Sequence, residues 1–357
     1  MHLWSTGSSC DRAAGVPMRV AVLGAGSWGT TLASLSAGGN DTVLWSRDAD
    51  VADEVARERR NSAYLPDVQL DPTLRATCDL EVALEDAELV LLAVPSKYLR
   101  SVLEQVVGLV PATADLISVA KGIETRTGLR MTEVVIDVLA HDPTRVGALS
   151  GPNLAREVAT GQPSTPVLAS PDEQRAARLR QALTTPTFRV FSNPDVVGCE
   201  VGGAAKNVIA IAAGIGDGLG YGWNTKAALI TRGLTEITRL GTALGASPIT
   251  FLGLAGDGDL IATCSSPQSR NRHVGEELGR GRPLEGIVAD MKMVAEGVST
   301  TGAIVELADR LDVPMPITRR VHEVLTATAS PEDAVRHLMS FEPGEELDDL
   351  TRDLGRR

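Results

Sequence analysis

The sequence has little positive charge for its length. Its 357 residues carry 34 Lys and Arg against 46 Asp and Glu, which gives a formal net charge of -12 at pH 7. Nucleic-acid binding rests on a basic electrostatic field, so this balance argues against DNA or RNA as a general partner. Any binding of phosphate groups must therefore be local, through a few cationic side chains.

Cysteine is also scarce. The four cysteines, Cys10, Cys78, Cys199 and Cys264, lie far apart and form neither a CxxC pair nor the spacing of a metal site. This pattern suits a reducing cytosol, so we expect a cytoplasmic protein without a catalytic thiol. The five histidines form no metal-site or triad pattern, and no GxSxG elbow of a serine hydrolase occurs. We therefore expect no metal and no serine-hydrolase chemistry.

Long apolar runs are missing as well. No stretch approaches the roughly 18–20 apolar residues that span a bilayer, so we expect no stable membrane insertion. Residues 1–17 lack the apolar core of a secretory signal and are expected to form a disordered tail, with translation from Met18 as an alternative. Because the chain is long for one core and 43% hydrophobic, two domains are the natural expectation.

The stretch from Met18 to Leu35 carries the strongest local signal. It reads as a short apolar strand, a GxGxxG turn formed by Gly24, Gly26 and Gly29, and a helix, which is the order of a dinucleotide-binding turn. The first glycine permits the tight turn, the second lets the backbone approach a pyrophosphate, and the third lets the helix pack on the strand. The alternative interpretation is a glycine turn that binds no ligand.

The end of the next expected strand bears on the choice of cofactor. Strand 42–45 is followed by Arg47 and Asp48. An acidic residue here favours the ribose of NAD, whereas an arginine accommodates the extra phosphate of NADP, so the sequence leaves NAD and NADP both open. Asp48 has the alternative role of capping a helix over 49–60, and Arg47 that of a solvated surface residue.

The remaining pattern predicts an α/β fold, a doubly wound Rossmann sheet followed by an all-α domain. Continuous apolar runs alternate with helical patterns, which is typical of parallel strands covered on both faces. The runs expected to form strands are 89–94, 115–119, 146–149 and 188–191, the last in this half. Helices are expected at 201–215, 225–244, 270–278, 283–293, 301–311 and 317–325. We place the sheet domain at 18–197, the helical domain at 198–342 and an acidic, frayed tail at 343–357.

Two lysines lie at positions that favour a catalytic role. Lys206 lies in a helix otherwise built of small and apolar residues. A buried ammonium group is costly unless paired, and desolvation lowers its pKa toward the range in which lysine exchanges a proton. Such a lysine lies either at a functional site or at a solvent edge. Lys121 follows an apolar strand, so we expect it near the crevice at the strand ends.

A second group of candidates follows in the helical half. The segment GLAGDGDL places Asp259 in a glycine-rich turn that lacks the spacing of an EF-hand, and we expect this carboxylate beside a lysine. In QSRNRH, the residues Ser269, Arg270 and Asn271 offer hydroxyl, guanidinium and amide donors that suit a phosphate. A solvated basic turn before a helix is the alternative.

Several of these motifs together resemble bacterial NAD(P)-dependent glycerol-3-phosphate dehydrogenase. They are GAGSWGT, VAKGIE, LSGPNLAREVA, GGAAKNVIAIAAGIGDG, NTKAALITRGLTEI, GLAGDGDLIATC, QSRNR and VAEGVSTT, in the family's order over residues 18–341. The resemblance implies a Rossmann domain, a helical domain related to that of 6-phosphogluconate dehydrogenase, and interconversion of dihydroxyacetone phosphate with sn-glycerol 3-phosphate. The product would supply phospholipid synthesis, and the family suggests a homodimer.

The resemblance also assigns residues, position by position. The catalytic positions that it implies are Lys206 as general acid and base, Asp259 as its carboxylate partner, and Lys121. The substrate contacts that it implies are Lys121, Gly151, Asn153, Lys206, Asp259, Ser269, Arg270 and Asn271. The cofactor contacts are Gly24, Gly26, Ser27, Trp28, Gly29, Arg47, Asp48, Lys121, Ala155, Arg270, Val294 and Glu296. Two positions depart from the family pattern: Asn153 stands where Ser or Thr is usual, and Asp48 where many members have a second basic residue.

Three other functions fit part of the sequence. Another dehydrogenase of the 6-phosphogluconate or 3-hydroxyacyl type shares the glycine turn but explains QSRNR less well. A redox-sensing protein that binds the nucleotide without chemistry does not need Lys206 and Asp259. An interaction scaffold does not need two lysines at crevice positions. Oxidation of NADH with dihydroxyacetone phosphate separates these functions.

Overall fold

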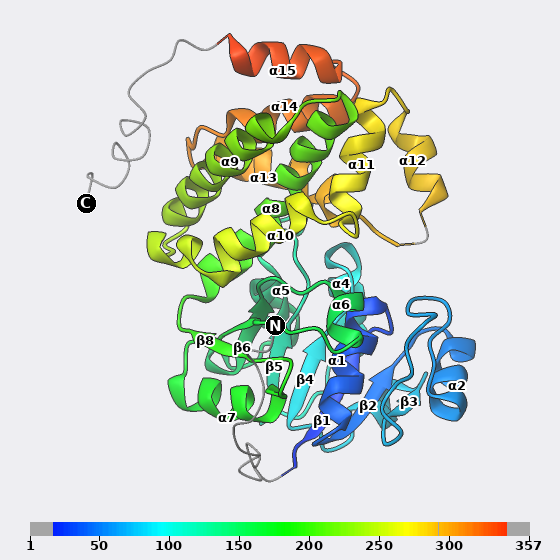
Figure 1. The fold of residues 1–357 in the computed structure, drawn as a ribbon. Helices are drawn as coiled ribbons and strands as arrows, with labels where there is room; N and C mark the ends of the chain where they lie inside the picture. The colour runs from blue at the N-terminus through cyan, green and yellow to red at the C-terminus, as the bar shows by residue number, and fades with distance from the viewer. Residues whose placement is uncertain (1–16, 292, 341–357) are drawn as a thin grey trace, which may run out of the picture.

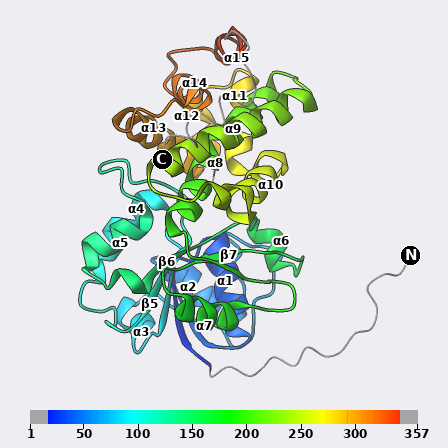
Figure 2. The same cartoon turned by 90° about the vertical axis from the view of Figure 1, so that its left-hand side faces the viewer.

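The computed structural model describes residues 17–291 and 293–340. A sheet with helices on both faces forms the N-terminal part, and helices alone form the C-terminal part, with the long helix α8 (Val196–Gly218) reaching from one into the other (Figure 1). Figure 2 shows the same division after a quarter turn. The predicted fold class, a Rossmann sheet followed by a helical domain, is therefore confirmed. The expectations for the two tails concern residues outside the described ranges, Pro17 excepted.

Eight strands form one sheet in the order β3-β2-β1-β4-β5-β6-β7-β8. The strands are β1 (Arg19–Leu23), β2 (Asp41–Trp45), β3 (Arg75–Thr77), β4 (Leu89–Leu92), β5 (Asp115–Ser118), β6 (Val146–Ser150), β7 (Val167–Ala169) and β8 (Phe191–Asn193). Neighbouring strands are parallel except β6 and β7, which are antiparallel. Because β1 pairs with β2 on one side and β4 on the other, the winding reverses there, and the carboxyl ends of these strands face a binding crevice.

Alternation along the strands buries both faces of the sheet. Val20 and Val22 of β1 belong to one apolar cluster, and Ala21 and Leu23 belong to the cluster on the other face. The first cluster includes residues of α1 (Ser27–Ala37), α2 (Ala49–Glu58), α6 (Ala155–Ala159) and α7 (Glu173–Leu183). The second includes residues of α3 (Leu80–Leu84), α4 (Ser96–Gln105) and α5 (Met131–Leu139). Two covered faces explain why the central strands are continuous apolar runs.

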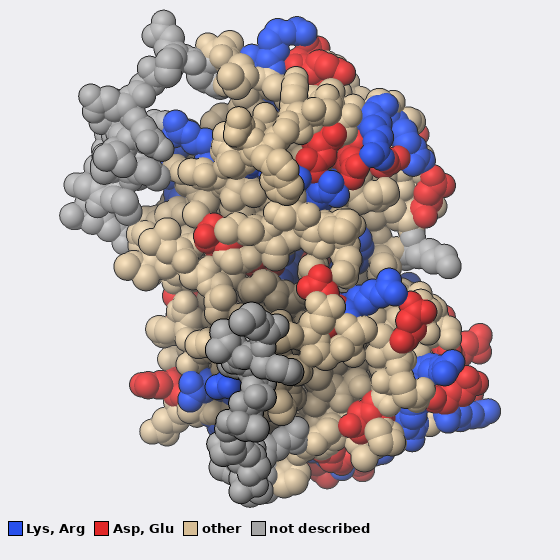
Figure 3. Space-filling model, in the orientation of Figure 1, with Lys and Arg blue, Asp and Glu red and all other residues tan. Residues whose placement is uncertain are grey.

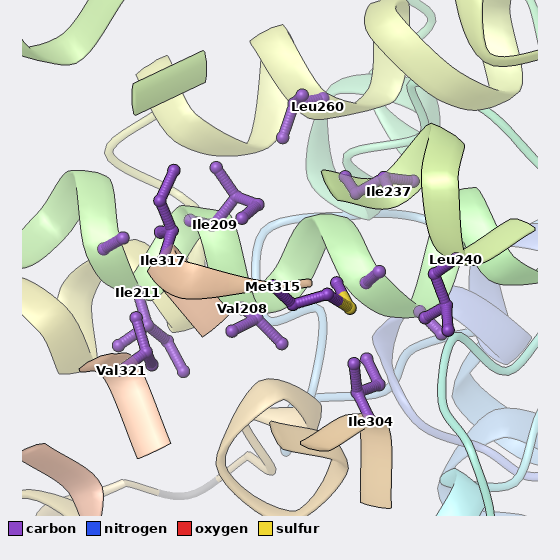
Figure 4. Packing of buried hydrophobic residues seen from close by; sticks show 14 of the residues in the cluster. Val208, Ile209, Ile211, Ile237, Leu240, Leu260, Ile304, Met315, Ile317 and Val321 are labelled. Atoms are coloured by element: carbon purple, nitrogen blue, oxygen red, sulfur yellow. The ribbon is translucent and has the colours of Figure 1, made fainter. Parts of the chain in front are cut away.

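The helical part is built around α8. The other elements here are α9 (Trp223–Ala243), α10 (Asp259–Ser265), α11 (Arg270–Gly279), α12 (Leu284–Asp290), α13 (Glu296–Arg310), α14 (Pro316–Leu325) and α15 (Pro331–Met339). Val208, Ile209 and Ile211 of α8 pack against side chains such as Ile237 and Ile304 from these helices (Figure 4). By length and composition α8 is also apolar enough to cross a membrane, but 89% of its most apolar window is buried inside the protein, as in the core helix of a soluble protein.

Glycines let α8 and α11 approach until their backbones touch. A Cβ on Gly214 would lie 2.0 Å from the carbonyl oxygen of Arg272, and a Cβ on Gly275 would lie 2.0 Å from that of Ile211. Gly218 is equally confined, with the Glu276 oxygen 2.2 Å from its Cβ position. No side chain fits at these positions, so the close approach fixes α11 against the C-terminal third of α8.

The start of α8 is tied to the sheet domain by a buried carboxylate. Glu200 accepts hydrogen bonds from the Thr132 amide at 2.9 Å, from the Thr132 hydroxyl at 2.5 Å and from the Arg130 guanidinium at 2.6 Å. Burial raises the pKa of Glu200, while the Arg130 charge and the Thr132 donors oppose that rise. This carboxylate satisfies the N-terminus of α5 and anchors α8 across the domain junction.

Several boundaries differ from the prediction. The strands β3 and β7 were not predicted, because each has three residues and neither forms a long apolar run. The last strand is β8 (Phe191–Asn193) rather than 188–191, since Phe188 is a buried core residue ahead of the strand. Helix α13 begins at Glu296 rather than at 301, which brings Glu296 to a helix N-terminus.

Candidate active site

The glycine turn has the shape that a dinucleotide needs. Gly24 has a φ of +115°, and a Cβ there would lie 2.7 Å from the Ala93 oxygen. A Cβ on Gly29 would lie 1.9 Å from the Gly24 oxygen, so α1 packs against β1 only without a side chain at this position. At Gly26 a Cβ would meet no described atom within 4 Å, and no described side chain caps α1. The amides of its first turn therefore have no side-chain cap among the described residues, which is the condition of an anion-binding helix N-terminus.

The neighbours of this turn support the same interpretation. The Ser27 hydroxyl lies 3.1 Å from the Met293 sulfur, so the turn adjoins the segment of the helical domain that contains Val294. Trp28 packs on Phe188 with 6.1 Å between ring centroids, and its indole nitrogen is buried without a hydrogen-bond partner among the described residues. Ala155, another predicted cofactor contact, accepts a hydrogen bond from Thr31 of α1 at 3.2 Å.

The residues after β2 divide between two roles. The Asp48 carboxylate accepts a hydrogen bond from the Asp50 amide at 3.0 Å and caps α2, which is the alternative that the sequence left open for it. The guanidinium of Arg47 lies 5.9 Å from the centre of the Tyr98 ring, and the Lys97 ammonium lies 4.8 Å from the same ring. Both cations thus lie near the Tyr98 ring, one of them from the segment directly after β2. A cofactor contact by Asp48 stays a prediction.

Lys206, Asp259 and Lys121 form one ion cluster. The Lys206 ammonium donates to Oδ1 of Asp259 and, at 2.5 Å, to the hydroxyl of Thr263. The Lys121 ammonium donates to Oδ2 of Asp259 at 2.7 Å and to the Gly151 carbonyl at 2.9 Å. Asp259 is 2% exposed and Lys206 5%. One buried carboxylate therefore holds two ammonium groups, one from each domain.

The groups around Lys206 shift its pKa. Burial lowers its pKa to about 8, the Asp259 carboxylate opposes that shift, and the Lys121 charge adds to it. The Cys264 thiol also faces this group, and its own pKa is raised by burial to about 12. A lysine with a pKa near 8 is suited to give and take a proton near neutral pH.

The loop after β6 contributes groups to the same place. Gly151, with a φ of +100°, presents its carbonyl to Lys121. The amide nitrogen of Asn153 donates to the Ser150 carbonyl at 3.1 Å, while its Oδ1 and the Ser150 hydroxyl are buried without hydrogen-bond partners among the described residues. Buried polar atoms without partners are rare, and they are expected where a ligand supplies the partner.

The phosphate candidates lie at the start of α11. The Ser269 hydroxyl caps this helix by accepting from the Arg272 amide at 3.2 Å, so one of its lone pairs serves the helix. Arg270 is exposed in the first turn of α11. Asn271 is 8% exposed and donates to Asn207 at 2.9 Å, which places it beside Lys206 on α8. Arg270 thus lies at the solvent side of this region, and Asn271 lies against the helix that carries Lys206.

Glu296 joins the two domains at the ends of β4 and β5. Its Oε1 accepts from the Ser96 amide at 2.8 Å, and its Oε2 accepts from the Lys121 amide at 3.1 Å. Val294 is half-buried in the segment before α13. The sequence pattern offered no signal for Thr263, an ordinary threonine within a helix, whose hydroxyl accepts from Lys206.

Comparison with known proteins decides the family. The family model described as NAD-dependent glycerol-3-phosphate dehydrogenase N-terminus matches residues 19–176, and the corresponding C-terminus model matches residues 195–336. The chain belongs to the glycerol-3-phosphate dehydrogenase family. It is an NAD(P)-dependent oxidoreductase, and the open glycine turn agrees with that cofactor class.

Individual members of the family are similar over almost their whole length. A glycerol-3-phosphate dehydrogenase (NAD(P)+) of Corynebacterium diphtheriae is 52% identical over 324 residues, which cover 90% of this chain and 98% of the relative. One from Sphingopyxis alaskensis is 48% identical over 329 residues, covering 92% and 98%. The crystal structure of the enzyme from Coxiella burnetii has a TM-score of 0.86 at 39% identity, covering 91% of this chain and 99% of that one.

Proposed function

We propose that the protein interconverts dihydroxyacetone phosphate and sn-glycerol 3-phosphate, with NADH or NADPH as the hydride donor for reduction. The observation that carries this proposal is the buried Lys206–Asp259–Lys121 cluster at the edge of a dinucleotide-binding sheet. Two ammonium groups and one carboxylate leave a net charge of +1, which suits the negative charge that develops on a ketone oxygen as it is reduced. The product would supply phospholipid synthesis in the cytoplasm.

The glycine turn and the residues around it would hold the cofactor. Gly24, Gly26 and Gly29 leave room for the pyrophosphate, and Ser27 and Trp28 begin the helix whose amides face it. When bound, the nicotinamide supplies the hydride that the side chains of this site cannot supply.

Lys206 would act as the general acid in the reduction. Its ammonium group, with a pKa of about 8, would protonate the substrate oxygen, and the resulting neutral amine would take the proton back in the reverse reaction. Asp259 and Thr263 orient Lys206, since each accepts a hydrogen bond from its ammonium group. Lys121 would hold and polarise the substrate, since its ammonium lies on the same carboxylate.

The phosphate of the substrate would bind at the start of α11. Arg270 would supply the planar guanidinium, with Ser269 and Asn271 beside it, and Gly151 and Asn153 would contact the glycerol part. Anchoring the phosphate orients the carbonyl toward Lys206 and lowers the entropy cost of the reaction.

Two variants test these roles. Lys206→Ala should lose most turnover while it still binds NADPH, because only the proton donor is removed. Arg270→Ala should raise the KM for dihydroxyacetone phosphate steeply, since a charge-assisted hydrogen bond contributes about 1.5–3 kcal/mol, or roughly 10- to 100-fold. Arg336→Ala, which removes an exposed arginine from α15, is the matched control for Arg270. Normal turnover in Lys206→Ala would remove Lys206 from the mechanism, and an unchanged KM in Arg270→Ala would remove the phosphate contact.

We further propose that the protein is a homodimer without stable membrane insertion. Closed two-fold dimers are the commonest assemblies of soluble enzymes, which supports this expectation. On the face drawn in Figure 3, Lys and Arg alternate with Asp and Glu, a mixed surface typical of a water-soluble protein. Light scattering coupled to size-exclusion chromatography would give the mass, and a monomer at assay concentration would contradict the dimer.

A further inference from the structure

The backbone of Lys121 is held on both sides by the helical domain. Its amide donates to Oε2 of Glu296 at 3.1 Å, and its carbonyl accepts from the side-chain amide of Asn207 at 3.1 Å. Glu296 begins α13 and Asn207 lies on α8, whereas Lys121 follows β5 of the sheet. Both hydrogen bonds therefore cross the junction between the domains.

Asn271 closes these contacts into a ring. Its amide nitrogen donates to Oδ1 of Asn207 at 2.9 Å, and its Oδ1 accepts from the Gly297 amide at 2.9 Å. Gly297 directly follows Glu296, so the path returns to Lys121 through the backbone of α13. Asn207 and Asn271 are 4% and 8% exposed. Each asparagine bridges two neighbours, and the ring joins the sheet to three helices.

The space around the ring is filled. A Cβ on Gly297 would lie 2.8 Å from Oδ1 of Asn271, and a Cβ on Gly122 would lie 2.3 Å from the Ser96 hydroxyl. The second oxygen of Glu296 accepts from the amide of Ser96 at 2.8 Å, which fixes that carboxylate at the N-terminus of α4. The Lys121 peptide consequently has one well-defined position when the domains are in contact.

We propose that Asn207, Asn271 and Glu296 form a clamp on the Lys121 peptide that positions the Lys121 ammonium group on Asp259. The inference rests on the proposed function, in which Lys206 exchanges a proton beside that carboxylate. In this role the three clamp residues are positioning residues, because they act through Lys121. The clamp makes the arrangement of the ion cluster depend on contact between the domains.

Release of the clamp should raise the pKa of Lys206, whereas a simple loss of packing should not. Among the described residues, the titratable groups that act most on Lys206 are Asp259 and the Cys264 thiol from α10 and Lys121 from the loop after β5. If the Lys121 ammonium leaves Asp259, one repulsive charge is removed from Lys206 and the carboxylate serves Lys206 alone. Both changes favour the protonated form, so the pKa of Lys206 rises.

The test compares Asn207→Ala with Asn224→Ala, in which the same residue type is removed from an exposed position on α9. Both full-length proteins are assayed for turnover, for the pH dependence of ketone reduction and for Tm. Asn207→Ala should lower kcat about 10- to 100-fold, as expected for a misplaced charged group. The alkaline limb of its pH profile should move above pH 8, and Asn224→Ala should match the unmodified protein in both readouts.

A second comparison uses the Lys121→Ala background, where there is no ammonium group left to position. In that background the addition of Asn207→Ala should change kcat less than about twofold and leave the alkaline limb of the pH profile in place. The reason is that both substitutions act through the Lys121 ammonium group, which is already absent. If Asn207→Ala does not fold, Glu296→Gln is used instead. It replaces one carboxylate oxygen of the residue that accepts from the Lys121 amide, and it should produce the same upward shift of the limb.

The outcomes separate this inference from the proposed function. An unshifted limb in Asn207→Ala, or losses of kcat that multiply in the Lys121→Ala background, would overturn the clamp even where Lys206→Ala is inactive. Normal turnover in Lys206→Ala would instead overturn the role of Lys206 as the proton donor. A lower Tm in Asn207→Ala with an unchanged pH profile would indicate a structural role only and would also overturn the clamp.

Discussion

Replacing either of two glycines on α8 by alanine should change the stability of the protein, in opposite directions for the two positions. A Cβ at Gly214 would lie 2.0 Å from the Arg272 oxygen and 2.8 Å from the Glu276 nitrogen, both backbone atoms of α11. A Cβ at Gly216 would meet only the end of the Leu229 side chain among the described atoms, at 3.8 Å, which is ordinary contact. We expect Gly214→Ala to destabilise the protein and Gly216→Ala to stabilise it.

The magnitudes follow from the contacts. To reach the 3.4 Å of ordinary contact from 2.0 Å, α11 must move away from Gly214→Ala by about 1.4 Å. Forcing extra volume into a packed core costs about 1–3 kcal/mol, and a backbone obstacle places this case at the upper end. Alanine is favoured over glycine inside a helix by about 0.5–1 kcal/mol. The net expectation is a loss of about 2–2.5 kcal/mol for Gly214→Ala and a gain of about 0.5–1 kcal/mol for Gly216→Ala.

Thermal unfolding followed by circular dichroism measures both variants. With shifts of roughly 2–4 °C per kcal/mol for larger chains, Tm should fall by several degrees in the first variant and rise by a few in the second. Because α11 carries Asn271, Gly214→Ala should also reduce turnover, whereas Gly216→Ala should not. Tm shifts of the same sign in both variants, or an unchanged Tm in Gly214→Ala, would refute the argument that backbone contact sets the position of α11.

Three further predictions concern charge. The proposed role of Lys206 requires it protonated for reduction and neutral for oxidation, and burial lowers its pKa to about 8. The rate of reduction should therefore fall above pH 8 while that of oxidation rises; the same response in both directions would contradict this. Arg47→Ala should weaken NADPH binding about tenfold or more and leave NADH nearly unchanged in fluorescence titrations, since Arg47 follows β2 and the neighbouring Asp48 is engaged as a cap; equal weakening of both would contradict it. Burial raises the pKa of the Glu236 carboxyl group from 4.5 to about 7. Between these two pH values the native state keeps the carboxyl proton, whereas the unfolded state has lost it. The free energy of unfolding should therefore fall as pH rises from 4.5 to 7, by at most about 1.4 kcal/mol per pH unit. Glu236→Gln should flatten that part of the curve in denaturant titrations, and an unchanged slope would count against it.

The glycine turn and the buried lysine show what a sequence predicts well. Gly24, Gly26 and Gly29 have local tasks, so their spacing alone indicates the turn, and the structure places each glycine as expected. Lys206 stood out because a single cation in an apolar helix demands a partner, and Asp259 provides it. Signals of this kind depend on a few neighbouring residues, which is why they are visible before the fold is known.

The clamp could not be predicted in the same way. Asn207 contacts Lys121 across 86 residues and Asn271 across 64, and Glu296 contacts Lys121 across 175. Asparagine on a helix is compatible with many positions, so its partner depends on how the helices pack. The same reason hides Thr263, whose hydroxyl contacts Lys206 only because α10 crosses α8 there.

Two short strands were missed for a different reason, one at an edge of the sheet and one next to the strand at the other edge. With three residues, β3 and β7 have no periodicity to detect, and their pairing is decided by the strands beside them. The antiparallel direction of β7 follows from its connection to β6, which is a loop with a short helix and not a full crossover. The central parallel strands, in contrast, are long apolar runs covered on both faces.

The position of α8 bears on how the chain folds as it leaves the ribosome. Ala148 of β6, together with Val167 and Ala169 of β7, packs against Cys199 of α8 and Ala255 beyond it. The sheet half is synthesised first, yet this part of its surface stays open to water until residues 199 and 255 have emerged. A protein truncated before α8 would retain the glycine turn but expose that apolar face, so the sheet half matures only as the helical half is completed.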